Sequence, residues 1–349
     1  MSAAQVSVIV PVVAADDGFA RCLASLARLD PPCADLVVAL DGGDPEAAAL
    51  ASGAGAQVVR LTERRGPAAA RNAGARVARG EVLFFIDADV TLPRDAIARV
   101  VAAFDARPGC DAVIGSYDDA PGASNFLSQY KNLAHHFIHQ TSHEDACTFW
   151  GACGAIRREA FRRAGQFDEG YRRSSIEDVE LGSRLAETGA RIRLDRTLQV
   201  THWKRWTPVA LLRSEVRDRA VPWTRLILKT GRMPNDLNLR WSGRVAVASA
   251  CLVPAAAALA VWYRPAWVAA VAAASLGAAL DLPLARFLRA KRGTVFAARA
   301  IGWQFVHHLC CAAGFAAGTV LHLVDAGRSR VRFPVDQPLG RLSGDGEHE

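Results

Sequence analysis

The sequence predicts an α/β fold, with a mostly parallel sheet flanked by helices, followed by apolar helices towards the C-terminus. Over the first 120 residues, short apolar runs alternate with segments of helical spacing, which is the pattern of βαβ units and a parallel sheet. From residue 245 onward, long runs that are almost free of charge replace this alternation. We therefore expect a globular domain over residues 1–240, membrane-associated helices over 241–325 and a polar tail over 326–349.

The strands and helices of the first half follow from their apolar spacing and their end signals. The expected strands are residues 6–11, 35–41, 56–61, 81–87 and 110–117. The expected helices are residues 18–29, 45–53, 66–80 and 93–104. Pro67 suits the first turn of its helix, and Gly80 suits the end of it. Residues 120–240 are less regular and more polar, with helix-like stretches at 124–140 and 177–188.

The composition bounds the class of protein. Hydrophobic residues make up 51% of the 349 residues and charged residues 22%, which excludes an intrinsically disordered chain. The net charge of +7 favours phosphate or an anionic membrane face as a partner, unless the many arginines reflect drift in a GC-rich genome. The eight cysteines form no CxxC pair and are expected to be reduced, apolar fillers. The apolar run in "MSAAQVSVIVPVV" is too short for a signal peptide, so we expect the chain to start in the cytoplasm.

Three apolar runs follow the globular region, at residues 245–263, 266–280 and 294–324. The first is long enough to span about 30 Å of hydrocarbon, with buried helices of a soluble domain as the alternative. Basic residues flank the first two runs and favour the cytoplasm, which predicts a hairpin. They are Arg240, Arg244, Arg286, Arg289, Lys291 and Arg292. Because Arg328, Arg330 and Arg332 also favour the cytoplasm, either the third run is re-entrant or interfacial, or the charge rule fails there.

Two carboxylates end the fourth expected strand, in "LFFIDADV" at residues 83–90. An unpaired carboxylate in a dry core is costly, and ligands of parallel sheets bind beyond the carboxyl ends of the strands. We therefore expect Asp41, Asp87 and Asp89 to line a ligand crevice. Residues two apart on a strand project about 6–7 Å from each other, whereas two oxygens on one Mg²⁺ lie at most about 4 Å apart. The pair either turns sharply to clasp one ion, or one acid binds the ion and the other a hydroxyl.

Five segments, in order across residues 5–205, resemble the motifs of family 2 glycosyltransferases, which have the GT-A nucleotide-sugar fold. They are "VSVIVPVV", "VVALDGGDPEA", "GPAAARNAGARVARGEVLFFIDADV", "FWGACGAIRREAFRRAGQFDEGY" and "IEDVELGSRLAETGARI". One departure is the loop after the first strand, where Asp16 and Asp17 lie further along than the family's acid. The resemblance implies a nucleotide-binding half at about 1–118 and an acceptor half at about 119–240.

On the donor side, the resemblance implies that Mg²⁺ or Mn²⁺ neutralises the leaving nucleotide diphosphate. It implies that Asp89 is the carboxylate of that ion and that Asp87 contacts the ribose or the donor. It also implies that Asp41 is the partner of the nucleobase, against which Pro11 and Val12 would lie.

The helix before the two acids carries the Arg-Asn-x-Gly motif. Arg71 is expected either near the phosphates or, alternatively, as a solvated helix arginine. Asn72 and Gly74 are expected to serve packing and turn geometry.

On the acceptor side, the resemblance implies Asp178 as the base that takes the proton from the acceptor hydroxyl. The alternative is that Glu177 and Asp178 are acids at a helix start, where the dipole favours them. One enzyme carboxylate and direct displacement invert the anomeric configuration. Gly151, in the Gly-rich segment, and Glu177 are further acceptor-side candidates.

Several ring-bearing residues are further candidates. His202, in "THWKRW", is implied to approach the metal or the diphosphate, although an isolated histidine is more often structural. Arg219 and Trp223 can cradle a sugar or a lipid phosphate by stacking and ion pairing. The full Gln-x-x-Arg-Trp motif of processive relatives is missing, which predicts a single transfer. The remaining histidines of this region are expected at a surface or an interface, with metal binding, which their spacing allows, as the alternative: His135, His136, His139 and His143.

The resulting expectation is an inverting, metal-dependent glycosyltransferase at the cytoplasmic face of the inner membrane. Its partners would be a UDP- or GDP-sugar, a lipid or lipid-linked acceptor and the membrane, with no nucleic acid. Two alternatives are a catalytically inactive, membrane-anchored scaffold that binds sugar nucleotides, and a sugar-nucleotide nucleotidyltransferase. The second would want a Gly-rich basic loop after the first strand, which "PVVAADDGF" does not supply.

Overall fold

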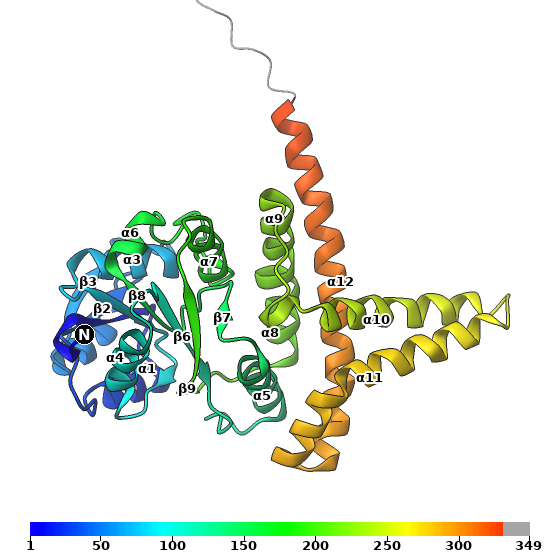
Figure 1. Cartoon of the computed structure of the whole chain (residues 1–349), viewed down its shortest axis with the longest axis horizontal. Helices are drawn as coiled ribbons and strands as arrows, with labels where there is room; N and C mark the ends of the chain where they lie inside the picture. Colours follow the sequence, from blue (N-terminus) through cyan, green and yellow to red (C-terminus); the bar gives the residue numbers. More distant parts are fainter. Residues whose placement is uncertain (331–349) are drawn as a thin grey trace, which may run out of the picture.

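The computed structural model describes the backbone of residues 1–330 and the side chains of residues 1–325. An α/β domain and a group of long helices make up this part of the chain, and Figure 1 shows the two parts next to each other. The expected polar tail at 326–349 falls mostly outside the described residues. Its first part, residues 326–330, continues the last helix.

The first half of the α/β domain is a parallel sheet with helical crossovers. Its elements are the 3₁₀ helix η1 (Ala3–Gln5), β1 (Val6–Val12), α1 (Asp17–Leu26), β2 (Asp35–Leu40), α2 (Pro45–Gly53), β3 (Gln57–Arg60), α3 (Pro67–Val77) and β4 (Val82–Ile86). β1 pairs in parallel with β2 and β4, and β2 pairs in parallel with β3. Asp16 and Asp44 accept backbone hydrogen bonds from the first turns of α1 and α2, which fixes where these helices begin.

The second half is a mixed sheet. Its elements are β5 (Val90–Thr91), α4 (Ala96–Ala106), β6 (Ala112–Tyr117), α5 (Phe126–Thr141), β7 (Asp145–Ala146), β8 (Cys153–Arg157), α6 (Arg158–Arg163), α7 (Glu177–Glu187) and β9 (Ile192–His202). The strand order is β3-β2-β1-β4-β8-β6-β9-β5, with β7 beside β9. β8 is antiparallel to β4 and β6, and β9 is antiparallel to β5 and β7. The expected parallel pairing therefore holds throughout the first four strands, and the sheet is completed by antiparallel pairs together with the parallel pair of β6 and β9.

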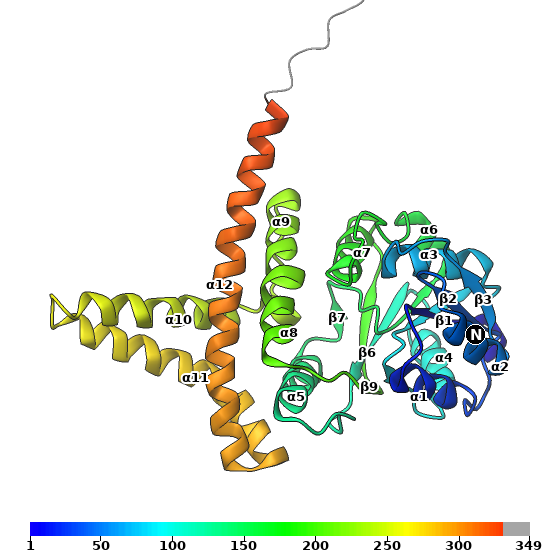
Figure 2. The same cartoon turned by 180° about the vertical axis from the view of Figure 1, so that it is seen from behind.

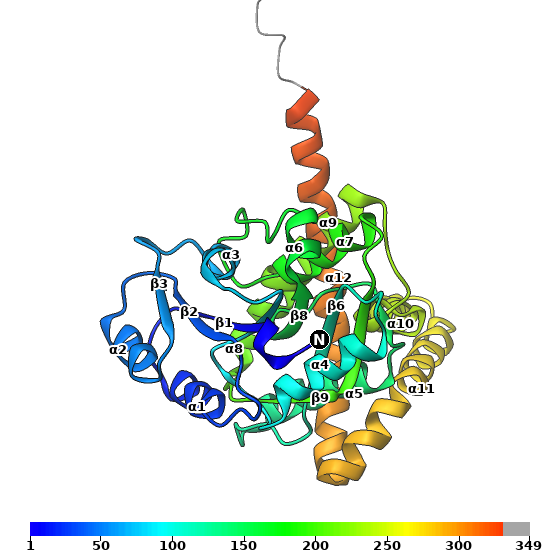
Figure 3. The same cartoon turned by 60° about the vertical axis from the view of Figure 1, so that its left-hand side comes forward.

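Alternate residues of the strands feed two cores, one on each face of the sheet. Val8 and Val10 of β1 pack with α1, α2 and α4, whereas Ile9 packs with α3. Neighbouring Phe84 and Phe85 of β4 divide between the faces in the same way. Figure 3 shows α1, α2 and α4 on one side of the sheet and α3, α6 and α7 on the other. Because both faces are covered, polar ligands reach the sheet at the ends of its strands.

The helical part follows β9. Its elements are α8 (Pro208–Arg213), the π-helical segment η2 (Ser214–Ala220), α9 (Val221–Thr230), the 3₁₀ turn η3 (Leu237–Leu239), α10 (Trp241–Leu259), α11 (Ala266–Arg292) and α12 (Thr294–Arg330). Among the described residues, α10, α11 and α12 are each long and apolar enough to cross a membrane. α10 and α11 form the expected hairpin, and α12 is one continuous helix that runs crosswise to it (Figure 1, and Figure 2 from behind).

α5 links the α/β domain to the long helices. An apolar cluster joins α5 to α11 and α12, and its buried members are Tyr130, Leu133, Leu284, Leu288, Ala297 and Ala300. The hydroxyl of Tyr130 also donates a hydrogen bond to Gln304 of α12, at 2.7 Å. α5 therefore couples the position of the long helices to the second half of the sheet.

Candidate active site

The two acids after β4 have different partners, because the chain turns between them. Asp87 Oδ1 lies 2.6 Å from Nη2 of Arg71, and its side chain is one-third exposed. Asp89 Oδ2 lies 3.5 Å from Nε2 of His202. The two carboxylates thus have separate side-chain partners, and whether one of them binds an ion and the other a hydroxyl stays a prediction.

Arg71 is a buried ion-pair centre. Its guanidinium binds Asp87 with one nitrogen and Glu177 with another, at 2.6 and 2.8 Å, and its side chain is only 4% exposed. Burial alone would lower the pKa of Arg71, but the charges of Asp87 and Glu177 outweigh burial and raise it. The solvated alternative for Arg71 is therefore wrong: the helix turns this residue inward, where it ties β4 to the start of α7.

Strand pairing brings His202 to the DxD segment. β5 directly follows Asp89 and pairs antiparallel with the end of β9, with Val90 opposite His202. The imidazole ring of His202 stacks on Tyr117, with ring centroids 4.4 Å apart and 7° between planes. Burial opposes the ionised form of Asp89, but hydrogen bonding and charge from His202, together with Lys204, lower its pKa.

Asp178 lies at the start of α7 and faces Gly151. Its Oδ2 accepts a hydrogen bond from the backbone N–H of Gly151 at 2.9 Å. Removal from water and the adjacent charge of Glu177 raise the pKa of Asp178 to about 6, against the opposing effects of Gly151 and Arg71. A carboxylate with a raised pKa that still loses its proton near neutral pH is suited to accept a proton from a hydroxyl.

These residues line one cavity of about 150 Å³, which we call the acidic cavity. Its walls include the following sequence-predicted residues: Arg71, Asp87, Asp89, Glu177, Asp178, His202, Arg219 and Trp223. Gly151 is hydrogen-bonded to one wall residue, Asp178. The structure thus brings both DxD acids and the expected base to one place, although they come from β4 and α7, far apart in the sequence.

A second cavity of about 830 Å³ adjoins the acidic cavity, and we call it the helix cavity. It lies among α5, α8, η2, α9 and the three long helices, and most of its wall is apolar. Residues that line both cavities are Lys131, His135, Arg219, Trp223, Leu237 and Asn238. Within the described part of the chain, the guanidinium of Arg219 has no hydrogen-bond or ion-pair partner. A free cation therefore stands where the polar cavity meets the apolar one.

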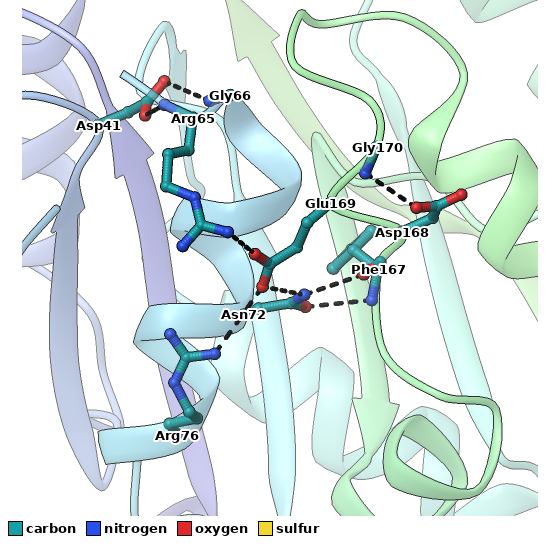
Figure 4. Close-up of polar contacts among 9 residues, drawn as sticks. All are labelled: Asp41, Arg65, Gly66, Asn72, Arg76, Phe167, Asp168, Glu169 and Gly170. Atoms are coloured by element: carbon teal, nitrogen blue, oxygen red, sulfur yellow. Dashed lines mark hydrogen bonds and ion pairs between the residues drawn. The ribbon is translucent and has the colours of Figure 1, made fainter. Parts of the chain in front are cut away.

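Pro11, Val12 and Asp41 lie outside the walls of the acidic cavity, at the carboxyl ends of β1 and β2. The two oxygens of Asp41 accept hydrogen bonds from the backbone N–H groups of Arg65 and Gly66, at 2.6 and 2.9 Å (Figure 4). Asp41 thereby holds the loop that leads into α3, and its role towards a nucleobase stays a prediction.

Asn72 and Gly74 have the structural roles expected for them. The Asn72 side chain exchanges two hydrogen bonds with the backbone of Phe167 and donates one to Glu169, which also pairs with Arg65 (Figure 4). This links α3 to the "QFDE" turn. A Cβ on Gly74 would lie 2.6 Å from Ile9, so the close contact of α3 with β1 requires glycine.

The surface expectation for the histidines is wrong for His136 and His139, which are buried. The Nδ1–H group of each donates a hydrogen bond to a backbone carbonyl of β6, at 2.7 and 2.9 Å, because α5 packs against that strand. His135, which precedes them on α5, lines both cavities, and burial with nearby positive charges lowers its pKa.

Sequence reasoning also missed some residues of the two cavities. Tyr117 and Trp150 line the acidic cavity, and Glu215, paired with Lys131, lines the helix cavity. Of these residues, only Tyr117 could have been suspected from the sequence, because it lies at the end of the fifth expected strand.

The residues present fit a divalent cation that also binds phosphate. Among residues 1–325, no group of three or more acidic, histidine or cysteine side chains is arranged to hold a metal ion. A carboxylate and an imidazole nevertheless lie side by side at Asp89 and His202, open to the acidic cavity. Mg²⁺ in phosphate sites is commonly held by one or two protein ligands, with phosphate oxygens and water completing the set.

Comparison with known proteins agrees with this geometry. Residues 7–165 match the family model for glycosyl transferase family 2. The chain contains a family 2 glycosyltransferase domain. The matched range includes β1, both DxD acids and the Gly-rich segment, and it ends before Asp178 and His202. A search of curated proteins gave no significant match.

Solved structures are similar to this chain in fold. The mannosyltransferase PcManGT from Pyrobaculum calidifontis, in complex with GDP-Man and Mn²⁺, is 21% identical, with a TM-score of 0.55 over 92% of this chain and 87% of that one. S. aureus TarS 1–349 is 15% identical, with a TM-score of 0.48 over 95% and 94% of the two chains. GalNAc-T7 with UDP, GalNAc and Mn²⁺ is 18% identical, with a TM-score of 0.48 over 64% and 47%. The likeness to PcManGT shows the GT-A fold of this glycosyltransferase.

Proposed function

We propose that this glycosyltransferase moves a sugar from a UDP- or GDP-sugar to a lipid or lipid-linked acceptor, in a metal-dependent reaction that inverts the anomeric centre. The observation that carries the proposal is the meeting of two cavities. One contains Asp87, Asp89 and Asp178, and the other is a largely apolar space among helices that can cross a membrane.

On the donor side, Asp89 and His202 would hold Mg²⁺ or Mn²⁺. The bound ion neutralises the charge that develops on the departing diphosphate. Asp87 remains one-third exposed although Arg71 binds one of its oxygens, so its other oxygen is free to accept a hydroxyl of the donor. Arg71 keeps Asp87 ionised and in place, and we assign it to positioning rather than to direct contact with phosphate.

On the acceptor side, Asp178 would accept the proton of the attacking hydroxyl. The N–H of Gly151 orients its carboxylate, and the buried Glu177 beside it raises its pKa towards neutrality. A single base of this kind requires direct displacement at the anomeric carbon, and therefore inversion. Asp87 and Glu177 are bound to Arg71, which leaves Asp178 as the acid suited to this step.

The acceptor would lie with its apolar chain in the helix cavity and its head in the acidic cavity. Arg219 has no ionic partner among residues 1–325 and lies at the junction, where a guanidinium can bind an anionic lipid head group. Trp223 lines the same junction and can stack on a sugar. This arrangement places the reaction at a membrane surface, which we assign to the cytoplasmic face of the inner membrane.

The test uses purified full-length protein, a panel of labelled nucleotide sugars and lipid extract from the host membrane. We expect one UDP- or GDP-sugar to label a lipid only when Mg²⁺ or Mn²⁺ is present, with inverted configuration in the product. Asp89→Asn should lose both transfer and metal-dependent donor binding, whereas Asp178→Asn should lose transfer alone. Full transfer by Asp89→Asn would remove the metal assignment, and donor binding by the wild type without transfer would favour a scaffold.

A further inference from the structure

The three apolar helices do not have equivalent surroundings. The hairpin of α10 and α11 projects away from the rest of the protein, and large apolar side chains along it are exposed. No charged residue occurs in it between Val245 and Tyr263 or between Ala266 and Leu280. With about 1.5 Å per residue, the charge-free stretch of the first arm is about 28 Å long, close to the thickness of a bilayer's hydrocarbon core, and that of the second is about 22 Å long. Asp281 follows the second stretch and pairs with His308 of α12.

The tip of the hairpin has the composition of a membrane–water interface. Trp262, Tyr263 and Trp267 are 83%, 58% and 53% exposed, and Arg264 stands between them. Tryptophan and tyrosine gather at the head-group level of membranes, and a cation there finds lipid phosphates. At the other end of α11, the exposed Arg289, Lys291 and Arg292 form the opposite boundary.

α12 differs because it lies against charged neighbours for much of its length. A Cβ on Gly314 would lie 2.3 Å from Cβ of Ala220, and one on Gly318 would lie 2.7 Å from Thr224, so α12 packs tightly on η2 and α9. Asp325 of α12 also pairs with Arg225 of α9, at 2.6 Å. The exposed charges on the consecutive segments α8, η2 and α9 are Arg213, Arg217, Arg225 and Lys229.

A spanning α12 would carry these charges into hydrocarbon, where each is strongly disfavoured. The directions of the helices also argue against a spanning α12. α12 runs crosswise to the hairpin, with the α/β domain on one side of the α9–α12 pair and the hairpin on the other (Figures 1 and 2). The hairpin and α12 therefore cannot both follow the membrane normal.

We propose that only α10 and α11 cross the bilayer, and that α12 lies with α9 along the interface on the same side as the catalytic domain. The partner of α12 is the lipid surface itself. Large apolar side chains are exposed along it at Val295, Phe305, Phe315, Val320, Leu323 and Val324, whereas Gln304, His307 and His308 turn towards α5, η2 and α11. The exposed Arg299 lies over the ring of Phe126 of α5. A helix with this division of residues is suited to lie in the plane of a membrane.

This orientation has two consequences. It removes the conflict over the basic residues that follow the third apolar run in the sequence, because both ends of α12 then stay on the catalytic side. It also holds the helix cavity, whose wall includes His307, Cys310 and Phe315 of α12, at the level of the lipid head groups.

The topology of the full-length protein tests this inference in spheroplasts of a producing strain. In Trp262→Cys, an impermeant maleimide added from outside should label the tip well above the wild type, whose own cysteines give the background. An epitope placed after residue 349 should bind antibody only once the membrane is opened. An epitope that is reachable from outside would show that α12 spans, and an unlabelled tip would show that the hairpin does not; either result overturns the inference.

A matched pair of lysine substitutions tests the same point by energetics. Val271 in α11 and Val320 in α12 are exposed to similar degrees, 61% and 59%. Val271→Lys should lower the membrane-inserted fraction roughly ten-fold or more, because the charge would lie within the hydrocarbon. Val320→Lys should leave insertion unchanged, since lysine at the interface reaches water. Equal effects, or the reverse order, would contradict the proposed orientation.

The inference rests on the membrane association proposed above but not on the catalytic assignments. Donor binding by the same variants, measured in detergent, separates the two. Normal donor binding in a protein with a different topology would contradict only this inference. Loss of donor binding in a protein with the proposed topology would contradict only the proposed function.

Discussion

At the scale of single residues, the site is organised around one buried arginine. Arg71 neutralises Asp87 and Glu177, and so these two acids can lie beside Asp178 in one small cavity without all being driven to the neutral form. Asp178, which Arg71 does not contact through a hydrogen bond, is the acid whose pKa rises to about 6. The chemistry of Asp178 is therefore set largely by residues that do not touch substrate.

The pH dependence of transfer should report this arrangement. Because Asp178 must be ionised to accept a proton, kcat/KM should rise through about pH 6 and level off above it. Glu177→Gln removes the charge that helps to raise the pKa of Asp178, so the rise should move to lower pH. Glu180→Gln, on the same helix but paired with Arg184, serves as the control and should leave the profile in place. A profile that is the same in all three proteins would exclude Asp178 as the titrating base.

The same raised pKa predicts that the ionised form of Asp178 destabilises the fold. The folded state holds this proton more tightly than the unfolded chain, whose pKa is near 3.8, so stability falls as pH rises from about 4 through 6. Asp178→Asn, which keeps an oxygen for the N–H of Gly151, should therefore raise the free energy of unfolding by about 2–3 kcal/mol at pH 7. The gain should vanish near pH 4.

The control for this measurement is Asp44→Asn. Backbone N–H groups at the start of α2 lower the pKa of Asp44, so its loss of charge should give no gain at pH 7. Denaturant unfolding at several pH values measures both variants. An Asp178→Asn protein that is no more stable than the wild type at pH 7 would contradict the burial argument.

Residues of the site could be predicted where the sequence pattern that indicates them lies next to them in the chain. Asp87 and Asp89 were found because an apolar strand runs straight into them, and their shared cavity with Asp178 agrees with that interpretation. The inward turn of Arg71 was not predictable, because its partner Glu177 lies 106 residues away and only the fold brings the two together. The buried histidines were missed for the same reason: α5 is polar in sequence, but it packs on β6.

At the scale of elements, the sequence patterns were sufficient wherever a strand or helix is regular. Strands β1 to β4 and the helices between them match the expected segments closely, since their ends carry Pro, Gly or an acidic cap. The antiparallel strands β5, β7 and β8 were not predicted, because two of them are only two residues long. α12 was recognised as an apolar run, but its direction depends on packing against η2 and α9, which no local pattern encodes.

Close packing of α12 on η2 gives a sharp prediction at this scale. Gly314→Ala places a methyl group 2.3 Å from Cβ of Ala220, so α12 must move away from η2. Gly302→Ala, on the same helix, meets nothing within 4 Å and should stabilise by about 0.5–1 kcal/mol through helix propensity. Melting in detergent should therefore shift in opposite directions for the two variants. A gain for both would mean that α12 and η2 are further apart than described here.

At the scale of the whole molecule, two environments meet at one junction. The α/β domain supplies charges that suit a nucleotide diphosphate, and the helices supply an apolar space that suits a lipid chain. Glu215 of η2 links the two parts, because it is buried between Lys131 of α5 and His307 of α12. The position of the helices is thus coupled, through η2, to Arg219 at the mouth of the acidic cavity.

If the helix cavity holds the acceptor chain, filling it should block the acceptor and spare the donor. Gly243 of α10 lines this cavity, and a Cβ there meets nothing within 4 Å, so Gly243→Phe should extend a ring into the cavity without disturbing its wall. We expect transfer to lipid to fall at least roughly ten-fold, as expected for the loss of 1.4 kcal/mol or more of acceptor binding, with unchanged donor binding and unchanged hydrolysis of the donor by water. Gly302→Phe, which has the same open surroundings but lies outside the cavity, should leave all three rates as they are. If Gly243→Phe lowers transfer and hydrolysis together, the cavity acts on the catalytic residues rather than on the acceptor; if it lowers neither, the acceptor reaches Asp178 by another route.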